Sequence, residues 1–492
     1  MNTLVLSGSG VTIADIAAVA RQDTIVTATP GIWARLAEAR AVLDAAAASG
    51  QQIYGLNTGL GANLKTAVAD ETGEFQPQLV RGRGAGVGPA LLRDETRAVM
   101  AARLSMLATG GSGLSPDVFA DLLALINHKV HPLVPSIGSI GAGDLVLLSA
   151  IAQTMIGEGQ AEYDGVVLAS AEALSKAGLR PSVLGPKDGL SLLNASAVSA
   201  GKGALAVADA GVLLDYQRQA AAFSFEGLGG NPLILTPAIQ RARPAAGQIQ
   251  EAEGLLARLE GSSLHDARTA IQDPLSLRCV ASIHGALAHA LDAAREAVEI
   301  ELNAAADNPL VLVDENRVLS TGNFHTPSLA LAFETLGLAI AQTALACAAR
   351  FIQLTGSGRN GLPRYLSSVG GASAGFVPLQ KTVVALAGAI RHKANPVMLD
   401  FLPVSEGVED HATQTLLAVA KCADMLSLWR HLIACEMLAG AQAVDLRAGH
   451  RCGRGTQLTH DLVRSVAGPL VEDRPLGYEV SRLAERLRDT GR

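Results

Sequence analysis

Several residue types and patterns are scarce or missing in this sequence, and each absence argues against a class of protein. The five cysteines never form a Cys-x-x-Cys pair, which argues against a disulfide framework or a structural zinc site. The histidines contain no His-x-x-x-His motif, so no metal centre is expected. Aromatic residues make up only 3% of the chain, whereas hydrophobic residues, mostly alanine, leucine and valine, reach 49%. This imbalance favours helices packed closely together, because alanine lets helix backbones approach.

Neither nucleic acid nor a membrane is an expected partner. The formal net charge is −7 and the sequence has no long basic run. The best apolar run, Thr335 to Ala349, is too short to cross a bilayer and is flanked by Glu334 and Arg350. The N-terminus, MNTLVLSGSGVTIADI, lacks the basic start and long apolar core of a signal peptide. The sequence therefore predicts a cytoplasmic, soluble protein.

The chain is expected to form two domains, because 492 residues exceed one ordinary core. Residues 1–195 are interrupted by glycine and proline, which predicts a smaller, loop-rich domain. Residues 196–492 carry long alanine-rich stretches with helical spacing, which predict a helical bundle. These stretches lie at about 280–305, 327–354, 376–394 and 411–440. The fold class is therefore mainly α, and helix faces this apolar predict a homo-oligomer.

Three segments carry residues suited to chemistry, although each also has a structural interpretation. Tyr54 lies at the edge of the glycine loop YGLNTGLG (54–61), where it could act as a general base or pack in the interior. Arg278 follows a turn at the start of a long helix, where a guanidinium can bind a carboxylate or form a structural ion pair. The segments GNFH (322–325) and EDH (409–411) bring polar residues to predicted helix starts, where capping alone would explain them.

Taken together and in order, these segments resemble the aromatic amino acid ammonia-lyases, the family of histidine and phenylalanine ammonia-lyase. The resemblance covers nearly the whole chain. The matching segments are YGLNTGLG (54–61), GSIGAGDL (138–145), GLSLLNAS (189–196), QDPLSLRC (272–279), ELNAAADNPL (301–310), GNFH (322–325) and EDH (409–411). It implies an ammonia-lyase-like fold with a long central helical bundle, assembled as a homotetramer whose active sites each draw on three subunits.

The resemblance also assigns roles to individual residues. Tyr54 matches the loop tyrosine that removes the β-proton of the substrate, and Glu409 matches the glutamate near the substrate's amino group. Arg278 matches the arginine that binds the substrate carboxylate. Three further residues match groups around the bound substrate: Asn194, Gln272 and Phe324, the last of which lines the pocket.

The sequence departs from the family pattern at three positions. The Ala-Ser-Gly that cyclises into the family's methylidene-imidazolone electrophile is here only Ala142-Gly143. Ser139 is a poor substitute, because it is followed by Ile140 whereas the cyclisation needs a glycine amide as nucleophile. Leu275 stands where the family usually has a second tyrosine. Arg83 stands where histidine-specific members have a histidine.

Loss of the electrophile restricts the chemistry that the site can perform. A base strong enough to remove a C–H proton would first deprotonate an ordinary ammonium group, which leaves a neutral amine as a very poor leaving group. A quaternary ammonium has no N–H to lose and departs as a neutral amine, so only a base, a carboxylate-binding group and a favourable field are needed. The sequence is similar in this respect to the ergothionase branch of the family, which splits ergothioneine into trimethylamine and thiolurocanate without a cofactor.

Three cations are candidates for contact with such a substrate. Arg83 suits the sulfur of a thiolated imidazole ring, since a thione or thiolate prefers a cationic donor. Lys65 and Lys393 are candidates for contact with the ring or the carboxylate, and a solvated or structural amine is the competing interpretation for both. A lowered pKa of Tyr54 would have a physical cause if Lys65 or Arg83 lay beside it.

Three alternatives stay open from the sequence. The chain could be an ordinary ammonia-lyase whose electrophile forms from Ser139 or a variant triad. It could be a catalytically silent member that serves as a binding protein or subunit. It could also eliminate trimethylamine from another betaine, such as the trimethylbetaine of histidine without sulfur.

Overall fold

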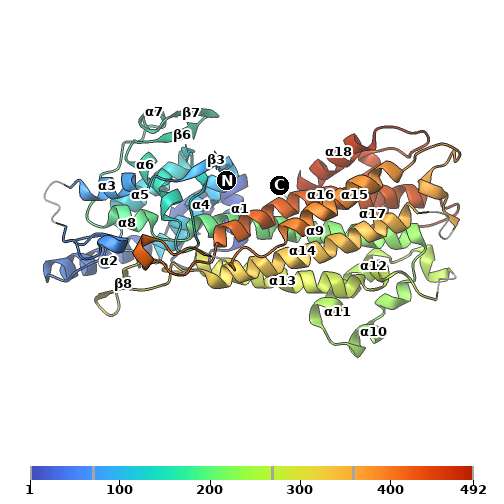
Figure 1. Cartoon of the computed structure of the whole chain (residues 1–492), viewed down its shortest axis with the longest axis horizontal. Coiled ribbons are helices and arrows are strands. Elements are labelled where there is room, and N and C mark those ends of the chain that lie inside the picture. The colour runs from blue at the N-terminus through green and yellow to red at the C-terminus, as the bar shows by residue number, and fades with distance from the viewer. Residues whose placement is uncertain (1–2, 69–72, 268–270, 357–360, 400, 490–492) are drawn as a thin grey trace. The chain divides into compact units, whose positions relative to one another are not determined.

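The computed structural model describes residues 3–68, 73–267, 271–356, 361–399 and 401–489. These residues form two compact units (Figure 1). The first comprises residues 1–208, 294–332 and 396–420, and the second comprises residues 209–293, 333–395 and 421–492. The prediction of a mainly helical fold is confirmed. Four long helices, α9, α13, α14 and α16, contribute residues to both units.

The first unit combines helices with small sheets of short strands. Its helices are α1 (Ile13–Arg21), α2 (Pro30–Ala48), α3 (Phe75–Gly82), α4 (Arg93–Ala108), α5 (Pro116–Asn127), α6 (Leu145–Met155), α7 (Ser170–Lys176) and α8 (Asp188–Leu193), with short 3₁₀ turns η1 (Gly61–Asn63) and η6 (Ser405–Gly407). Its strands are β1 (Thr3–Leu6), β2 (Ile25–Ala28), β3 (Val87–Ala90), β4 (His131–Pro132), β5 (Pro135–Ile137), β6 (Gln160–Tyr163), β7 (Val166–Ala169), β8 (Leu310–Leu312) and β9 (Arg317–Leu319). Only β1 and β2 pair in parallel; the other pairs are antiparallel.

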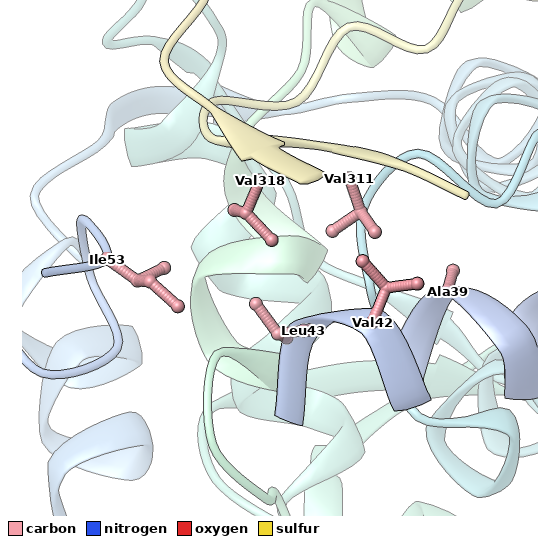
Figure 2. Packing of buried hydrophobic residues seen from close by; sticks show 6 residues of the cluster. All are labelled: Ala39, Val42, Leu43, Ile53, Val311 and Val318. Carbon is pink, nitrogen blue, oxygen red and sulfur yellow. The ribbon is translucent and has the colours of Figure 1, made fainter. Parts of the chain in front are cut away.

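The loop that carries Tyr54 begins at a buried apolar cluster between α2 and the β8–β9 hairpin (Figure 2). The cluster consists of Ala39, Val42, Leu43, Ile53, Val311 and Val318. Ile53 is only 1% exposed, and its neighbour Gln51 donates from its side-chain amide to the carbonyl oxygen of Val318 at 2.9 Å. Burial of an isoleucine side chain contributes roughly 1.5–3 kcal/mol relative to exposure. The cluster therefore anchors the start of the Tyr54 loop on the scaffold.

The second unit is built from long alanine-rich helices (Figure 1). Its elements include most of α9 (Ala197–Leu228) and parts of α13 (Val280–Leu302), α14 (Pro327–Leu354) and α16 (Thr415–Asp445). The remainder are η2 (Pro232–Leu235), α10 (Pro237–Ala242), α11 (Ala246–Arg258), η3 (Ser263–Asp266), α12 (Leu275–Arg278), η5 (Arg364–Leu366), α15 (Val377–Lys393), α17 (Arg454–Val466) and α18 (Leu476–Asp489). The helix predicted at 327–354 has these bounds, whereas the one predicted at 411–440 begins and ends later.

Small residues let the helices of the second unit pack closely. A Cβ atom on Gly227 of α9 would lie 2.8 Å from a methyl carbon of Leu354 of α14. A Cβ on Gly440 of α16 would lie 2.9 Å from the ring of Phe223 of α9. Both separations are shorter than a carbon–carbon contact allows, so the helices approach at distances that only glycine permits. The low aromatic content and high alanine content thus have a direct structural counterpart.

Among the described residues, two stretches are long and apolar enough to cross a membrane by length and composition, Asp188–Leu228 and Pro327–Leu354. Most of each apolar window, 72% and 61%, is buried inside the structure. Core helices of soluble proteins share these properties, so the burial favours a core position for both.

Candidate active site

Tyr54 lies half-buried in a tight turn that its own hydroxyl helps to close. The phenol oxygen accepts a hydrogen bond from the backbone N–H of Gly61 at 2.9 Å, and the backbone of Tyr54 forms a bridge with Thr58. A donor aimed at the phenol oxygen also stabilises negative charge there, which suits a residue that acts as a base. Within the part of the chain that the structure describes, Tyr54 makes no hydrogen bond with Lys65 or Arg83.

One buried glutamine joins the Tyr54 turn to helix α8. Gln76 is 1% exposed; its amide nitrogen donates to the carbonyl oxygen of Gly55 at 3.0 Å, and its amide oxygen accepts from the backbone N–H of Leu190 at 3.2 Å. Gly55 has φ +70°, and a Cβ at this position would lie 2.3 Å from a methyl carbon of Leu190. Only glycine fits so close to α8, so Tyr54 is held at a set distance from that helix.

Asn194 follows the last residue of α8 and is 5% exposed. Its amide nitrogen donates to the carbonyl oxygen of Asn308 at 2.7 Å. A Cβ on Gly143 would lie 3.7 Å from the amide oxygen of Asn194, so this oxygen sits beside the shortened loop. The structure therefore places Asn194 between α8 and the position where the family carries its electrophile.

The shortened loop is held by the buried carboxyl group of Asp144. One oxygen accepts from the hydroxyl of Ser139 at 2.6 Å and from the hydroxyl of Ser199 at 3.2 Å. The other accepts from the backbone N–H of Ser199 at 2.9 Å, and the backbone N–H of Asp144 donates to Ala195 at 2.8 Å. Burial raises the pKa of Asp144, although the hydrogen bonds from Ser139 and Ser199 act in the opposite direction. The hydroxyl of Ser139 is thus engaged in a structural hydrogen bond to Asp144.

Phe324 and Glu409 reach this region from two later segments of the first unit. The carbonyl oxygen of Phe324 accepts from the hydroxyl of Ser196 at 3.0 Å. The carboxylate of Glu409 accepts from the hydroxyl of Ser405, and a Cβ on Gly61 would lie 3.9 Å from Ser405. The turns that carry Tyr54 and Glu409 therefore lie side by side.

Three further candidates, Gln272, Arg278 and Lys393, lie in the second unit. Arg278 is half-buried at the end of α12, next to a turn held by Asp273, which accepts from the backbone N–H of Asn231 at 2.8 Å. Gln272 is exposed on the same turn. Lys393 ends α15 and is paired with Asp424, with 2.7 Å between the ammonium nitrogen and the carboxylate oxygen. This ion pair supports the interpretation of Lys393 as a structural amine rather than a substrate contact.

Lys65 and Arg83 lie in the first unit with Tyr54. Lys65 is exposed, and Arg83 is half-buried just after the last residue of α3. For the described residues, neither side chain has an ion pair or hydrogen bond, in contrast to Arg81, which binds Glu158 at 2.7 Å. Arg83 is therefore a partly desolvated cation available to a ligand.

The sequence interpretation missed three groups that organise the site. Gln76 has no motif around it, and nothing in its neighbourhood could have indicated its two buried contacts. Asp144 belongs to a matching segment, but its role as the anchor of the loop depends on Ser199, which is 55 residues away. His325 and His411 lie within matching segments, yet their mutual contact joins residues 86 positions apart.

Comparison with known proteins adds to this geometry. Residues 11–465 match the family model described as aromatic amino acid lyase. The chain is 38% identical over 484 residues to a histidine ammonia-lyase from Treponema denticola, covering 98% of this chain and 96% of that protein.

Among solved structures, it resembles ergothionase from Treponema denticola in complex with desmethyl-ergothioneine sulfonic acid. The TM-score is 0.95 and the identity 32%, with 99% of both chains covered. It also resembles a tyrosine aminomutase from Streptomyces globisporus, with a TM-score of 0.94, an identity of 29% and coverage of 99% and 96%.

The contact between Gly55 and Leu190 generates a test of the Tyr54 turn. Gly55→Ala should lower activity strongly, because it adds an overlap with α8 to the strain of an alanine at positive φ; the overlap alone should destabilise the protein by roughly 1–3 kcal/mol. The matched control is Gly50→Ala, since Gly50 has φ +84° with no atom within 4 Å of the added Cβ. Thermal unfolding and kcat measure both effects. Equal losses for the two variants would contradict a positional role for Gly55.

Proposed function

The chain belongs to the aromatic amino acid lyase family, and from this premise we propose that it eliminates trimethylamine from ergothioneine to give thiolurocanate, without a methylidene-imidazolone group. The family membership supports a carbon–nitrogen lyase. The likeness to the ergothionase of Treponema denticola supports the choice of substrate class. The observation that carries the proposal is the shortened loop at residues 138–145.

The residues of this loop do not fit the family's electrophile. The serine of Ala-Ser-Gly is missing, and the one serine nearby, Ser139, donates its hydroxyl to the buried Asp144 at 2.6 Å and accepts from the backbone N–H of Gly141 at 3.2 Å. A Cβ on Gly141 would lie 2.3 Å from the hydroxyl oxygen of Thr413, so the backbone here is closely enclosed. Cyclisation would have to break this packing and expel the Ser139 hydroxyl from its bond to Asp144.

A quaternary ammonium substrate makes the electrophile unnecessary. The Tyr54 oxygen, as phenolate, accepts the proton from Cβ of the substrate. The electrons of that C–H bond form the Cα–Cβ double bond while the Cα–N bond breaks, and both of its electrons leave with neutral trimethylamine. The trimethylammonium group cannot be deprotonated, so its charge and leaving ability do not depend on pH.

The remaining candidate residues provide binding groups for such a substrate. Glu409 supplies negative charge for the trimethylammonium group, and the ring of Phe324 offers an aromatic face to the same cation. The guanidinium of Arg278 binds the carboxylate, with the amides of Asn194 and Gln272 around it. With Tyr54, these five residues make up the catalytic, ammonium-binding and carboxylate-binding parts of the proposal.

We propose that cationic side chains recognise the thiolated ring. Arg83 is the first choice, since its guanidinium is half-buried and no described residue neutralises it. Lys65, exposed on the loop after Tyr54, is proposed to contact the ring or the carboxylate. Lys393 has the least support, because Asp424 already pairs with its ammonium group.

We propose that the protein assembles as a homotetramer with shared active sites and that it is located in the cytoplasm. Helix α14 presents Leu331, Leu338 and Leu345 at 55%, 50% and 41% exposure. They recur every seventh residue and therefore line one side of the helix, as in helices that pack against a partner.

Charge on this stripe tests the assembly. The double variant Leu338→Glu/Leu345→Glu should sediment as a smaller species than the unchanged protein, because two carboxylates would be desolvated at the interface. Val183→Glu is the control, as Val183 is 90% exposed and belongs to the loop between α7 and α8. An unchanged sedimentation coefficient for the double variant would contradict this surface.

The proposed reaction is tested by mixing the protein with ergothioneine, with histidine in parallel, and measuring trimethylamine, ammonia and thiolurocanate absorbance. We expect trimethylamine from ergothioneine and no ammonia from histidine. Tyr54→Phe should lower kcat roughly 10²- to 10⁴-fold through loss of the base, whereas Tyr163→Phe, on strand β6, should not.

Ammonia from histidine, accompanied by an intact mass lower by two waters, would show that an electrophile forms and would refute the proposal. Inactivity toward both substrates would leave the betaine alternative or the catalytically silent protein.

A substitution of Arg83 tests the specificity for the thiolated ring. Arg83→Leu should lower kcat/KM for ergothioneine roughly 10- to 100-fold, the loss of one charge-assisted hydrogen bond, and affect the trimethylbetaine of histidine much less. Arg81→Leu is the matched control, because it removes a charge from the same helix that is already paired with Glu158. Equal losses of kcat/KM for the two betaines would mean that Arg83 does not recognise the sulfur atom.

A further inference from the structure

Two histidine side chains meet beside the shortened loop. The Nε2 atom of His325 lies 2.8 Å from the Nδ1 atom of His411, and the rings meet edge to face with 5.0 Å between their centroids. His325 directly follows Phe324, and His411 comes two residues after Glu409. The contact therefore joins the two segments that carry the proposed trimethylammonium-binding residues.

The surroundings of His325 set the direction of this hydrogen bond. Its ring is also hydrogen-bonded to the backbone of Gly141, and since Nε2 faces His411, the Nδ1–H is left to donate to the Gly141 carbonyl. Nε2 of His325 must then accept, and Nδ1 of His411 must donate. This assignment follows from the hydrogen-bond network. For the described residues it leaves Nε2 of His411 as an unprotonated nitrogen without a hydrogen bond.

The segments that carry the two histidines also contact the shortened loop. The backbone of His325 forms a bridge with Ala142, while Thr413 donates its hydroxyl to Gly141 at 3.3 Å and Gln414 donates its backbone N–H to Ile140 at 2.9 Å. The loop is thus held by His325, just before α14, and by the two residues Thr413 and Gln414 that follow His411. A change in the charge or hydrogen bonding of either imidazole therefore acts directly on the segments that carry Phe324 and Glu409.

We infer that His325 and His411 form a positioning dyad that must be uncharged for the site to bind a trimethylammonium group. The inference rests on the proposed function and deepens it. The first proton taken up enters at the free Nε2 of His411, where it places a cation two residues from Glu409. That charge repels a substrate nitrogen whose own positive charge is permanent. Substrate binding, rather than proton abstraction, then weakens as the pH falls.

Several other charged groups lie on the segments around the dyad. Glu409 and Asp410 precede His411, and Glu406 lies on η6. Asp144 belongs to the shortened loop itself, and its charge acts on Glu301 near the end of α13. Burial, followed by the charge of His411, lowers the pKa of His325, while the hydrogen bond to Gly141 acts in the opposite direction. Both ring nitrogens of His325 are engaged in hydrogen bonds, so the nitrogen of the pair that is left to accept a proton is Nε2 of His411.

Glu301 is a neighbour whose protonation can imitate a pH effect of the dyad. Burial and then the charge of Asp144 raise the pKa of Glu301 to about 7, and one of its carboxyl oxygens is buried without a partner among the described residues. Its protonation removes negative charge as the pH falls. Glu301→Gln, which mimics the protonated form at every pH, therefore separates the two contributions.

The test compares His411→Asn with His411→Leu. The amide nitrogen of asparagine can donate from the place of Nδ1 but does not titrate, whereas leucine loses both the hydrogen bond and the titration. For the unchanged protein, KM for ergothioneine should rise roughly three- to thirtyfold between pH 8 and pH 5.5, with a smaller change in kcat. His411→Asn should remove this rise, His411→Leu should raise KM at every pH, and Glu301→Gln should retain the rise.

Binding measurements keep this inference separate from the proposed reaction. The dissociation constant of ergothioneine is measured by calorimetry for Tyr54→Phe and for Tyr54→Phe/His411→Asn over the same pH range. A rise at low pH in the first variant and none in the second supports the dyad, even if no trimethylamine is ever released. The same pH dependence in both variants, or none in either, would overturn it, whereas trimethylamine release by the unchanged protein would still support the proposed function.

Discussion

The buried carboxyl group of Asp144 is the interaction on which the site depends. It accepts from Ser139 within the shortened loop and from the backbone N–H of Ser199 in the first turn of α9. An anion at a helix N-terminus is favoured by the helix dipole and by N–H groups that lack helical partners. Through this one contact the loop is joined to α9, and Asn194 and Ser196, which precede α9, are set in place. Ser196 in turn holds Phe324.

The same contact links the packing of the loop to the proposed chemistry. A loop one residue shorter than its family's, with its serine hydroxyl directed at a buried carboxyl group, is poorly suited to building an electrophile from its own backbone. In the proposed reaction, the substrate itself must therefore carry a nitrogen that departs readily. In this proposal the enzyme keeps the base on the Tyr54 turn and the negative charge of Glu409. The Tyr54 turn packs against Leu190 of α8 at Gly55, and Gly61 of the same turn lies next to Ser405 in the turn that carries Glu409.

The fold was largely predictable, whereas the arrangement of the site was predictable only in part. The helix at 327–354 could be read from its alanine-rich, apolar periodicity, because such a stretch gains stability only by burying its faces. Matching segments indicated Tyr54, Asn194 and Glu409 as candidates, but not that Gln76 joins the Tyr54 turn to α8. A lone glutamine has no local pattern, since its meaning comes from two backbone groups separated by more than a hundred residues, Gly55 and Leu190.

By itself, the sequence determined that the protein is helical, that it belongs with the lyases of aromatic amino acids, and that its loop lacks the serine of the electrophile. The helical class follows from composition and periodicity, whereas the other two follow from the resemblance of short ordered segments to the family; all of these signals are local in the sequence. Only the tertiary structure decided that Ser139 is engaged by Asp144 and that His325 meets His411. Such contacts depend on the distances between segments far apart in the chain, and those distances are set by the packing of helices and turns rather than by any one stretch of residues.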